Sequence, residues 1–126
     1  MRLPILILLL SGCTTMPGSV SRDEAALSAE LQGRTAGAPE ACVSASGGGG
    51  LVIASADTLV YREGRTIWVN RLGGRCLGMR PDRQVLIEPS SGNRYCRGDR
   101  VRAIDLTTSY SGAICPLGDF IPYRAR

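Results

Sequence analysis

Apolar residues form one uninterrupted run near the start of the chain. Residues 3–10 read LPILILLL and follow Met1 and Arg2. A membrane-spanning helix takes about 20 apolar residues, so this run is too short to cross a bilayer and has the size of a signal-peptide core. The pattern predicts that residues 1–12 are an export signal.

A second apolar pattern, with a spacing of four, lies between residues 22 and 32. Leu27 and Leu31 share one side of a helix at this spacing. Ser21 and Glu24 fit a capping box at the start, and Gly33 fits a stop. We expect a short helix over residues 22–32. It could lie on a membrane surface, but its narrow apolar face favours a helix that is packed on the folded domain or held loosely.

From residue 51 onward, short runs of β-branched and aromatic residues alternate with turn residues, a pattern typical of compact β domains. In the run at 66–72, Ile67 and Val69 lie on one face, and Trp68, Asn70 and Leu72 lie on the other. The expected strands are residues 51–54, 59–62, 66–72, 84–88, 94–96 and 101–106, with 113–115 and 119–122 as a last short edge. The fold class predicted is mainly β: a small disulfide-stapled antiparallel sheet, sandwich or barrel with one short N-terminal helix.

The chain has 5 cysteines, an odd number, and the first stands apart from the rest. Leu10-Ser11-Gly12-Cys13 matches the bacterial lipobox, in which small residues precede a cysteine that becomes lipidated. The alternative is an ordinary secretory signal with a chance cysteine. The position directly behind the apolar run favours lipidation of Cys13, whose palmitate-type acyl chains would hold the protein on a membrane.

The other four cysteines suggest two disulfides in an exported chain, with three possible connectivities. Cys76 and Cys96 bracket the strand at 84–88, whereas Cys42 and Cys115 lie near the two ends of the domain. We expect the pairs Cys42–Cys115 and Cys76–Cys96. Because the chain has no histidine and no C-x-x-C spacing, we expect no metal site, no redox pair and no cofactor.

These features divide the chain into a lipoprotein signal peptide (residues 1–12), a lipidated tether with the short helix (13–41) and a disulfide-stapled β domain (42–126). Thr14 follows the lipidated cysteine, where an aspartate would retain the protein at the inner membrane. We therefore expect a lipid anchor facing the periplasm, in the outer membrane.

The 15 basic residues are all arginine and face 11 acidic residues, for a net charge of +4. Guanidinium groups bind phosphates and carboxylates, so an arginine cluster could contact anionic envelope components or another envelope protein. The cluster consists of Arg94, Arg97, Arg100 and Arg102. The alternative is that these charges are solvated or paired with Glu63, Glu88, Asp99 and Asp105. Nucleic acid is not an expected partner of an exported lipoprotein.

The composition also limits catalysis. Without histidine or lysine, Ser-His-Asp, Cys-His and Ser-Lys mechanisms are excluded. Paired carboxylates remain, with Glu88, Asp99, Asp105 and Asp119 as candidates. No spacing singles out a pair, and aspartates after glycine, such as Asp99 and Asp119, are common in turns. We therefore do not expect an enzyme.

Four motifs stand out, at residues 33–42, 70–78, 96–99 and 115–123. Together they resemble an uncharacterised family of small four-cysteine envelope proteins and lipoproteins of alphaproteobacteria, especially sphingomonads. One departure is Leu77-Gly78-Met79, where the family more often has Pro-Gly-Leu, and it concerns the local turn. The resemblance implies export and a four-cysteine framework, and it implies no catalytic residues.

The first hypothesis is therefore a membrane-anchored envelope lipoprotein that acts as a binding or structural module. A second hypothesis is an inhibitor of an envelope hydrolase, in which a rigid loop at residues 73–78 or 109–115 would plug an active site. A third is a carboxylate-based hydrolase.

Overall fold

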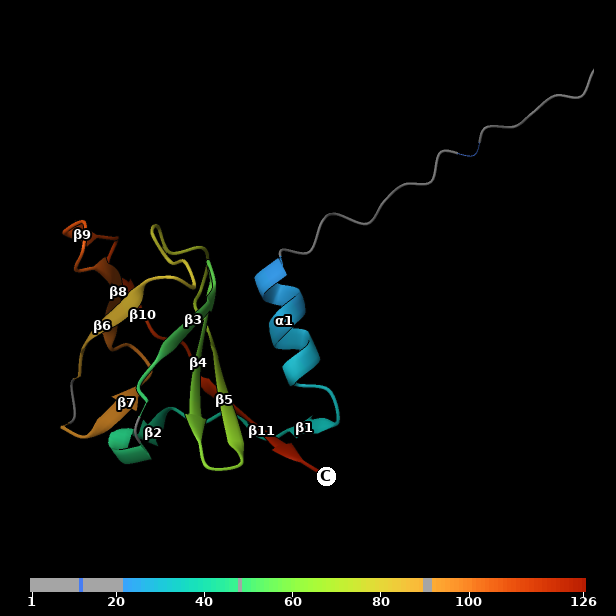
Figure 1. Cartoon of the computed structure of the whole chain (residues 1–126). Helices are drawn as coiled ribbons and strands as arrows, with labels where there is room; N and C mark the ends of the chain where they lie inside the picture. The colour runs from blue at the N-terminus through green and yellow to red at the C-terminus, as the bar shows by residue number, and fades with distance from the viewer. Residues whose placement is uncertain (1–11, 13–21, 48, 90–91) are drawn as a thin grey trace, which may run out of the picture.

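The computed structural model describes residues 12, 22–47, 49–89 and 92–126. The predicted signal peptide up to residue 11, Cys13 and the capping residue Ser21 lie outside the described residues. Within them, no helix is long and apolar enough to cross a membrane. Three antiparallel sheets and one α-helix make up the domain (Figure 1), which confirms the mainly β, disulfide-stapled fold with a single helix.

The largest sheet has five strands in the order β1-β11-β5-β4-β3. Its strands are β1 (Arg34–Ala36), β3 (Val52–Ser55), β4 (Thr58–Glu63), β5 (Thr66–Arg71) and β11 (Phe120–Ala125). The second sheet has the order β10-β8-β6, and β9 also pairs with β8. Its strands are β6 (Gln84–Glu88), β8 (Arg100–Asp105), β9 (Tyr110–Ser111) and β10 (Cys115–Pro116). A two-stranded sheet joins β2 (Cys42–Ser44) to β7 (Arg94–Cys96), and the 3-10 helix η1 (Ala45–Gly47) follows β2.

The helix α1 (Arg22–Glu30) packs on one face of the five-stranded sheet. Leu27 is its buried residue and joins Val60, Ile67 and Val69 in a small apolar cluster. The packing of this helix on the domain is thus confirmed. It ends two residues earlier than predicted, and the turn that follows includes Gly33 at φ +75°, a conformation that glycine adopts without strain.

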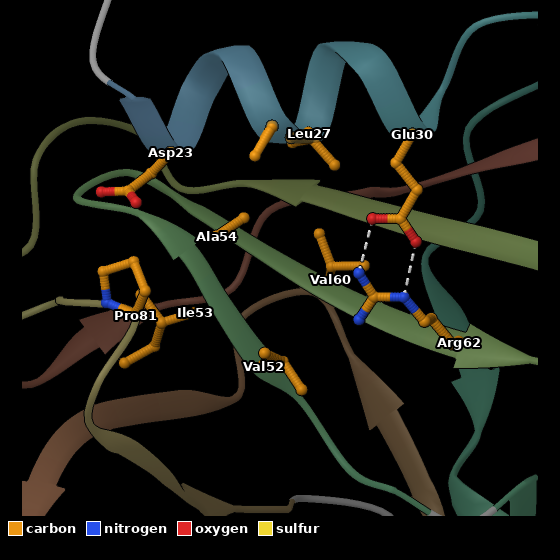
Figure 2. A pocket seen from close by; sticks show the side chains of 10 residues that line it. Asp23, Leu27, Glu30, Val52, Ile53, Ala54, Val60, Arg62 and Pro81 are labelled. Atoms are coloured by element: carbon orange, nitrogen blue, oxygen red, sulfur yellow. Dashed lines mark hydrogen bonds and ion pairs between the residues drawn. The ribbon is translucent and has the colours of Figure 1, made fainter.

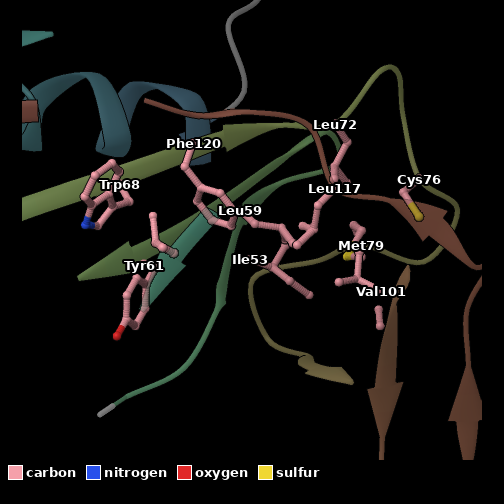
Figure 3. Close-up of a cluster of buried hydrophobic side chains, with 12 residues drawn as sticks. Ile53, Leu59, Tyr61, Trp68, Leu72, Cys76, Met79, Val101, Leu117 and Phe120 are labelled. Carbon is pink, nitrogen blue, oxygen red and sulfur yellow. The ribbon is translucent and has the colours of Figure 1, made fainter. Parts of the chain in front are cut away.

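The main core lies on the other face of the five-stranded sheet, toward the sheet of β6, β8 and β10. Trp68 and Leu72 point into it, so the predicted division of β5 into two faces is confirmed. Figure 3 shows Ile53, Leu59 and Phe120 on one side, with Met79 and Val101 continuing the cluster toward the second sheet. Alternation along β4 and β5 therefore supplies both apolar faces of one sheet.

The C-terminal strand differs from the prediction of a short edge. β11 has six residues and lies between β1 and β5, pairing with both. The three-residue strand β1 takes the edge position instead, with Arg34 opposite Ala125. β1, β2 and β9 were not predicted, because strands of two or three residues show no alternation long enough to recognise.

The predicted disulfide pairing is wrong. The bonds are Cys42–Cys96 and Cys76–Cys115. Cys42 and Cys96 are directly opposite in the β2–β7 register, with their Cα atoms 4.0 Å apart. Cys76 and Cys115 meet because the Ala113 N–H donates to the Leu77 carbonyl at 3.0 Å and aligns the two segments. The pairing follows spatial register, which proximity along the sequence does not reveal.

Candidate functional site: a disulfide-linked loop pair

Two connections at one end of the domain form a single rigid unit, called here the loop pair. One is residues 72–83, between β5 and β6, and the other is residues 106–114, between β8 and β10. The Cys76–Cys115 disulfide joins the first loop to the first residue of β10, directly after the second loop. The two loops include most of the two segments, 73–78 and 109–115, that the sequence suggested as inhibitory loops, and the structure shows that these segments contact each other.

Backbone and side-chain contacts reinforce the disulfide. Gly112 N–H donates to the Ala103 carbonyl at 2.8 Å, and a Cβ at position 112 would lie 2.6 Å from the Leu77 carbonyl oxygen. The Arg83 guanidinium lies 3.9 Å from the centre of the Tyr110 ring and also donates to the Gly78 carbonyl at 2.8 Å. A cation over an aromatic face is an attractive contact, so it adds to the hydrogen bond in fixing the loop pair.

Buried side chains and backbone hydrogen bonds also attach the loop pair to the rest of the domain. Leu72, Cys76 and Met79 are buried in the main core. The Cys76 N–H donates to the Ala56 carbonyl at 2.9 Å, and the Leu72 N–H donates to the Asp57 carbonyl at 2.7 Å. These bonds join the first loop to the β3–β4 turn, so its backbone is fixed over several residues.

The loop pair also exposes apolar side chains to solvent. Leu77 is 75% exposed and Leu106 is 77% exposed, the highest values among the large apolar residues that the structure describes. Val52, Leu86 and Ile114 are exposed between 43% and 48% and lie on or beside strands. The sequence indicated the exposure of Leu77 only weakly, by its place between Cys76 and Gly78 in a glycine-rich turn. It gave no indication that Leu106 is exposed.

The four candidate carboxylates each have a structural partner. Asp99 is buried and accepts from the Cys96 N–H at 2.8 Å. Asp119 pairs with Arg97 at 3.0 Å. The hydrogen bond from Arg100 lowers the pKa of Glu88, and the backbone N–H of Thr107 lowers the pKa of Asp105. These contacts account for the four carboxylates as turn and ion-pair residues, and they give no support to paired-carboxylate catalysis.

The four clustered arginines are distributed over more than one element. Arg100 and Arg102 lie on the same outward face of β8, whereas Arg94 is in β7 and Arg97 is in the turn that follows it. Arg97 pairs with Asp119 at 3.0 Å, and Arg100 pairs with Glu88 at 2.8 Å. Arg102 donates to the Ser111 hydroxyl at 3.1 Å. Exposed ion pairs of this kind are weak, so they leave these arginines able to exchange partners.

Several grooves lie along the sheets, and one of about 490 Å³ runs between α1 and the strands β1, β5 and β11. The groove in Figure 2, of about 190 Å³, runs between α1 and the β3–β4 hairpin, with Glu30 and Arg62 joined at one end by two hydrogen bonds of 2.7 Å. Asp23 and Pro81 line its other end. Another groove, of about 380 Å³, lies between β3 and β6 beside Tyr95. Among the described residues, no group of three or more acidic or cysteine side chains could hold a metal ion.

Fold and site together define a small disulfide-linked β domain that carries a rigid loop pair with an apolar surface. Comparison with protein-family models, with curated proteins and with solved structures finds no match to this chain.

Proposed function

We propose that this chain is a membrane-anchored bacterial envelope lipoprotein whose β domain acts as a binding or structural module. The support for the anchor is the lipobox that ends at Cys13, directly behind the apolar run. The support for a binding role is the loop pair, because a rigid surface with exposed leucines loses little conformational entropy on contact. We further propose the periplasmic face of the outer membrane as its location.

The loop pair is the single observation that carries the binding role in this proposal. Monomeric proteins expose isolated apolar side chains routinely, but Leu77 and Leu106 are about three-quarters exposed on segments that a disulfide and a cation–π contact hold in place. A binding surface is the simplest role that uses both properties.

Two measurements on protein from its native envelope test the proposal. Mass spectrometry of the mature chain should find Cys13 as an acylated N-terminus, and a Cys13→Ala variant should lose the acyl mass and the membrane association. A photo-crosslinking amino acid at position 77 should capture an envelope component, whereas the same amino acid at Arg65, in the β4–β5 turn, serves as the control. An unacylated chain that retains Met1, or equal capture at both positions, would contradict the proposal.

A specific observation also favours the second hypothesis, an inhibitor of an envelope hydrolase. Leu77 projects from a loop whose neighbour Cys76 is buried and disulfide-bonded, so the loop could enter a cleft without rearranging. Purified protein would then inhibit a lytic or proteolytic activity of an envelope extract, and Leu77→Ala would weaken that inhibition far more than Leu86→Ala. Equal inhibition by the two variants would argue against this role.

A further inference from the structure

We propose that the loop pair contacts lipid: Leu77 and Leu106 insert into the interfacial layer of the same bilayer that holds the acylated Cys13. This inference rests on the proposed lipoprotein function and names the partner of the loop pair. Its basis is the position of the two leucines relative to the point where the tether joins the domain.

The tether joins the domain at the end that carries the loop pair. Figure 1 shows the first turn of α1, the residue 72–83 loop and β9 of the second loop at one end of the molecule, and the C-terminus and the β4–β5 turn at the other. The contacts agree with this view. The Ser55 hydroxyl donates to Glu24 of α1 at 3.0 Å, while the neighbouring Ala56 accepts the Cys76 N–H. Asp23 and Pro81 line the same groove.

The length of the tether keeps this end near the membrane. Nine peptide units separate Cys13 from Arg22, and a fully extended chain of that length spans at most about 32 Å. Because α1 begins beside the loop pair, the tether restricts the loop pair more closely than the opposite end. Anchoring therefore raises the effective concentration of Leu77 and Leu106 at the bilayer surface.

The residues at this end favour apolar insertion over electrostatic adsorption. Leucine side chains partition into the boundary between head groups and acyl chains. The first loop carries Arg75, Arg80, Asp82 and Arg83. Two further aspartates flank the loops: Asp57 accepts the Leu72 N–H, and Asp105 is the last residue of β8. Arg80 and Asp82 also pair with each other at 3.2 Å. The contact should therefore depend little on anionic lipid or on salt, unlike adsorption through a basic patch.

Tryptophan fluorescence of the full acylated protein in vesicles tests this inference. Leu77→Trp and Leu106→Trp place a reporter at the loop pair, and Arg65→Trp places the matched control at the opposite end. Trp68 is buried and common to all three variants. Vesicles of phosphatidylcholine, alone or mixed with phosphatidylglycerol, carry brominated acyl chains as the quencher.

The expected result is that both loop reporters are quenched several-fold more strongly than the Arg65→Trp reporter, equally in the two vesicle types and at low and high salt. Equal quenching of all three reporters would overturn the inference. Quenching confined to anionic vesicles at low salt would also overturn it, because charge would then drive the contact. If Cys13 carries its acyl chains and quenching is absent, only this inference fails; if Cys13 is not acylated, the proposed function fails with it.

Discussion

At the scale of single residues, one buried polar side chain joins two parts of the chain that are far apart in sequence. Asn70 on β5 is fully buried, donates to the Gly118 carbonyl and accepts from the Gly118 N–H, each at 2.8 Å. The Asn70 amide thereby pairs with both the N–H and the carbonyl of Gly118, which lies in the connection between β10 and β11. A side chain without an amide group would leave the half-buried N–H and carbonyl of Gly118 unpaired.

Asn70→Ala is therefore expected to destabilise the domain by about 1–3 kcal/mol, since an unsatisfied buried polar group costs about that much and solvent reaches Gly118 in part. Urea unfolding with both disulfides intact measures the change. Asn93→Ala, at the other asparagine of the chain, is the control, because Asn93 is exposed. It should change stability by less than about 0.5 kcal/mol. Similar losses in both variants would show that the paired hydrogen bonds of Asn70 contribute little.

A second residue-scale feature links stability to pH. The hydrogen bond from Arg62 lowers the pKa of Glu30 below its ordinary value of 4.5. A carboxyl whose pKa is depressed on folding contributes stability above its ordinary pKa, and that contribution disappears as the pH falls through the depressed value. Because the Glu30 and Arg62 side chains are 36% and 47% exposed, solvent screening keeps the contribution small, below about 1 kcal/mol.

Glu30→Gln should accordingly be less stable than the unmodified chain near neutral pH, and the difference should vanish in acid, where Glu30 is itself uncharged. Denaturant unfolding of the two proteins across the acidic range measures this. Glu40→Gln, in the exposed segment before β2, should leave the stability unchanged. A difference that persists in acid would mean that packing, and not the charge, is what the substitution removes.

At the scale of elements, the loop pair depends on a close approach of two backbones. A Cβ at Gly112 would lie 2.6 Å from the Leu77 carbonyl oxygen, and a backbone atom cannot move aside as a flexible side chain can. A Cβ at Gly74, in the first loop, would have open space around it, with no atom within 4 Å. The two glycines therefore provide a matched pair of substitutions.

Gly112→Ala should separate the two loops, destabilise the protein by about 1–3 kcal/mol as overpacked sites do, and accelerate hydrogen exchange at the Ala113 N–H that donates to Leu77. Gly74→Ala should leave both quantities nearly unchanged. Exchange at Ala113 that is as slow in Gly112→Ala as in the unmodified chain would show that the loops tolerate the wider spacing.

The sequence predicted the elements with strong local patterns and failed where distant partners decide the structure. The β-branched and aromatic residues of β4 and β5 and the spacing of Leu27 and Leu31 indicated those elements, and the alternation in β5 indicated its two faces. β1 and β2 are three residues long, and they form because β11 and β7 offer paired backbones. The disulfide pairing failed for the same reason. The exposure of Leu106 depends on tertiary packing, which no local pattern encodes.

At the scale of the whole molecule, two cross-links join segments that are distant in sequence. The bonded cysteines are 54 and 39 residues apart, and loop entropy gives about 4 kcal/mol for each bond. The total, about 8 kcal/mol, is comparable to the whole stability of a typical domain, which is about 5–15 kcal/mol. We therefore expect the fold to depend on both cysteine pairs staying oxidised.

Reduction of both disulfides is expected to unfold most of the domain at physiological temperature. Loss of near-ultraviolet circular dichroism and rapid proteolysis after addition of reductant would measure this. Trypsin digestion without reductant identifies the two disulfides. Cleavage after arginine places each of the four cysteines on a different peptide, so each bond appears as one pair of linked peptides. A chain that keeps its tertiary signal when fully reduced would show that the apolar core suffices.

The packing of α1 also determines how the domain responds to mechanical load. Tension on the N-terminus acts first on a nine-residue helix attached mainly by Leu27 and by ion pairs with exposed partners. Unwinding that helix would lengthen the tether by about 17 Å, since extended chain advances roughly 1.9 Å more per residue than helix. Both disulfides lie on the C-terminal side of α1 and would stay closed, so the module could yield to a pull and still remain folded.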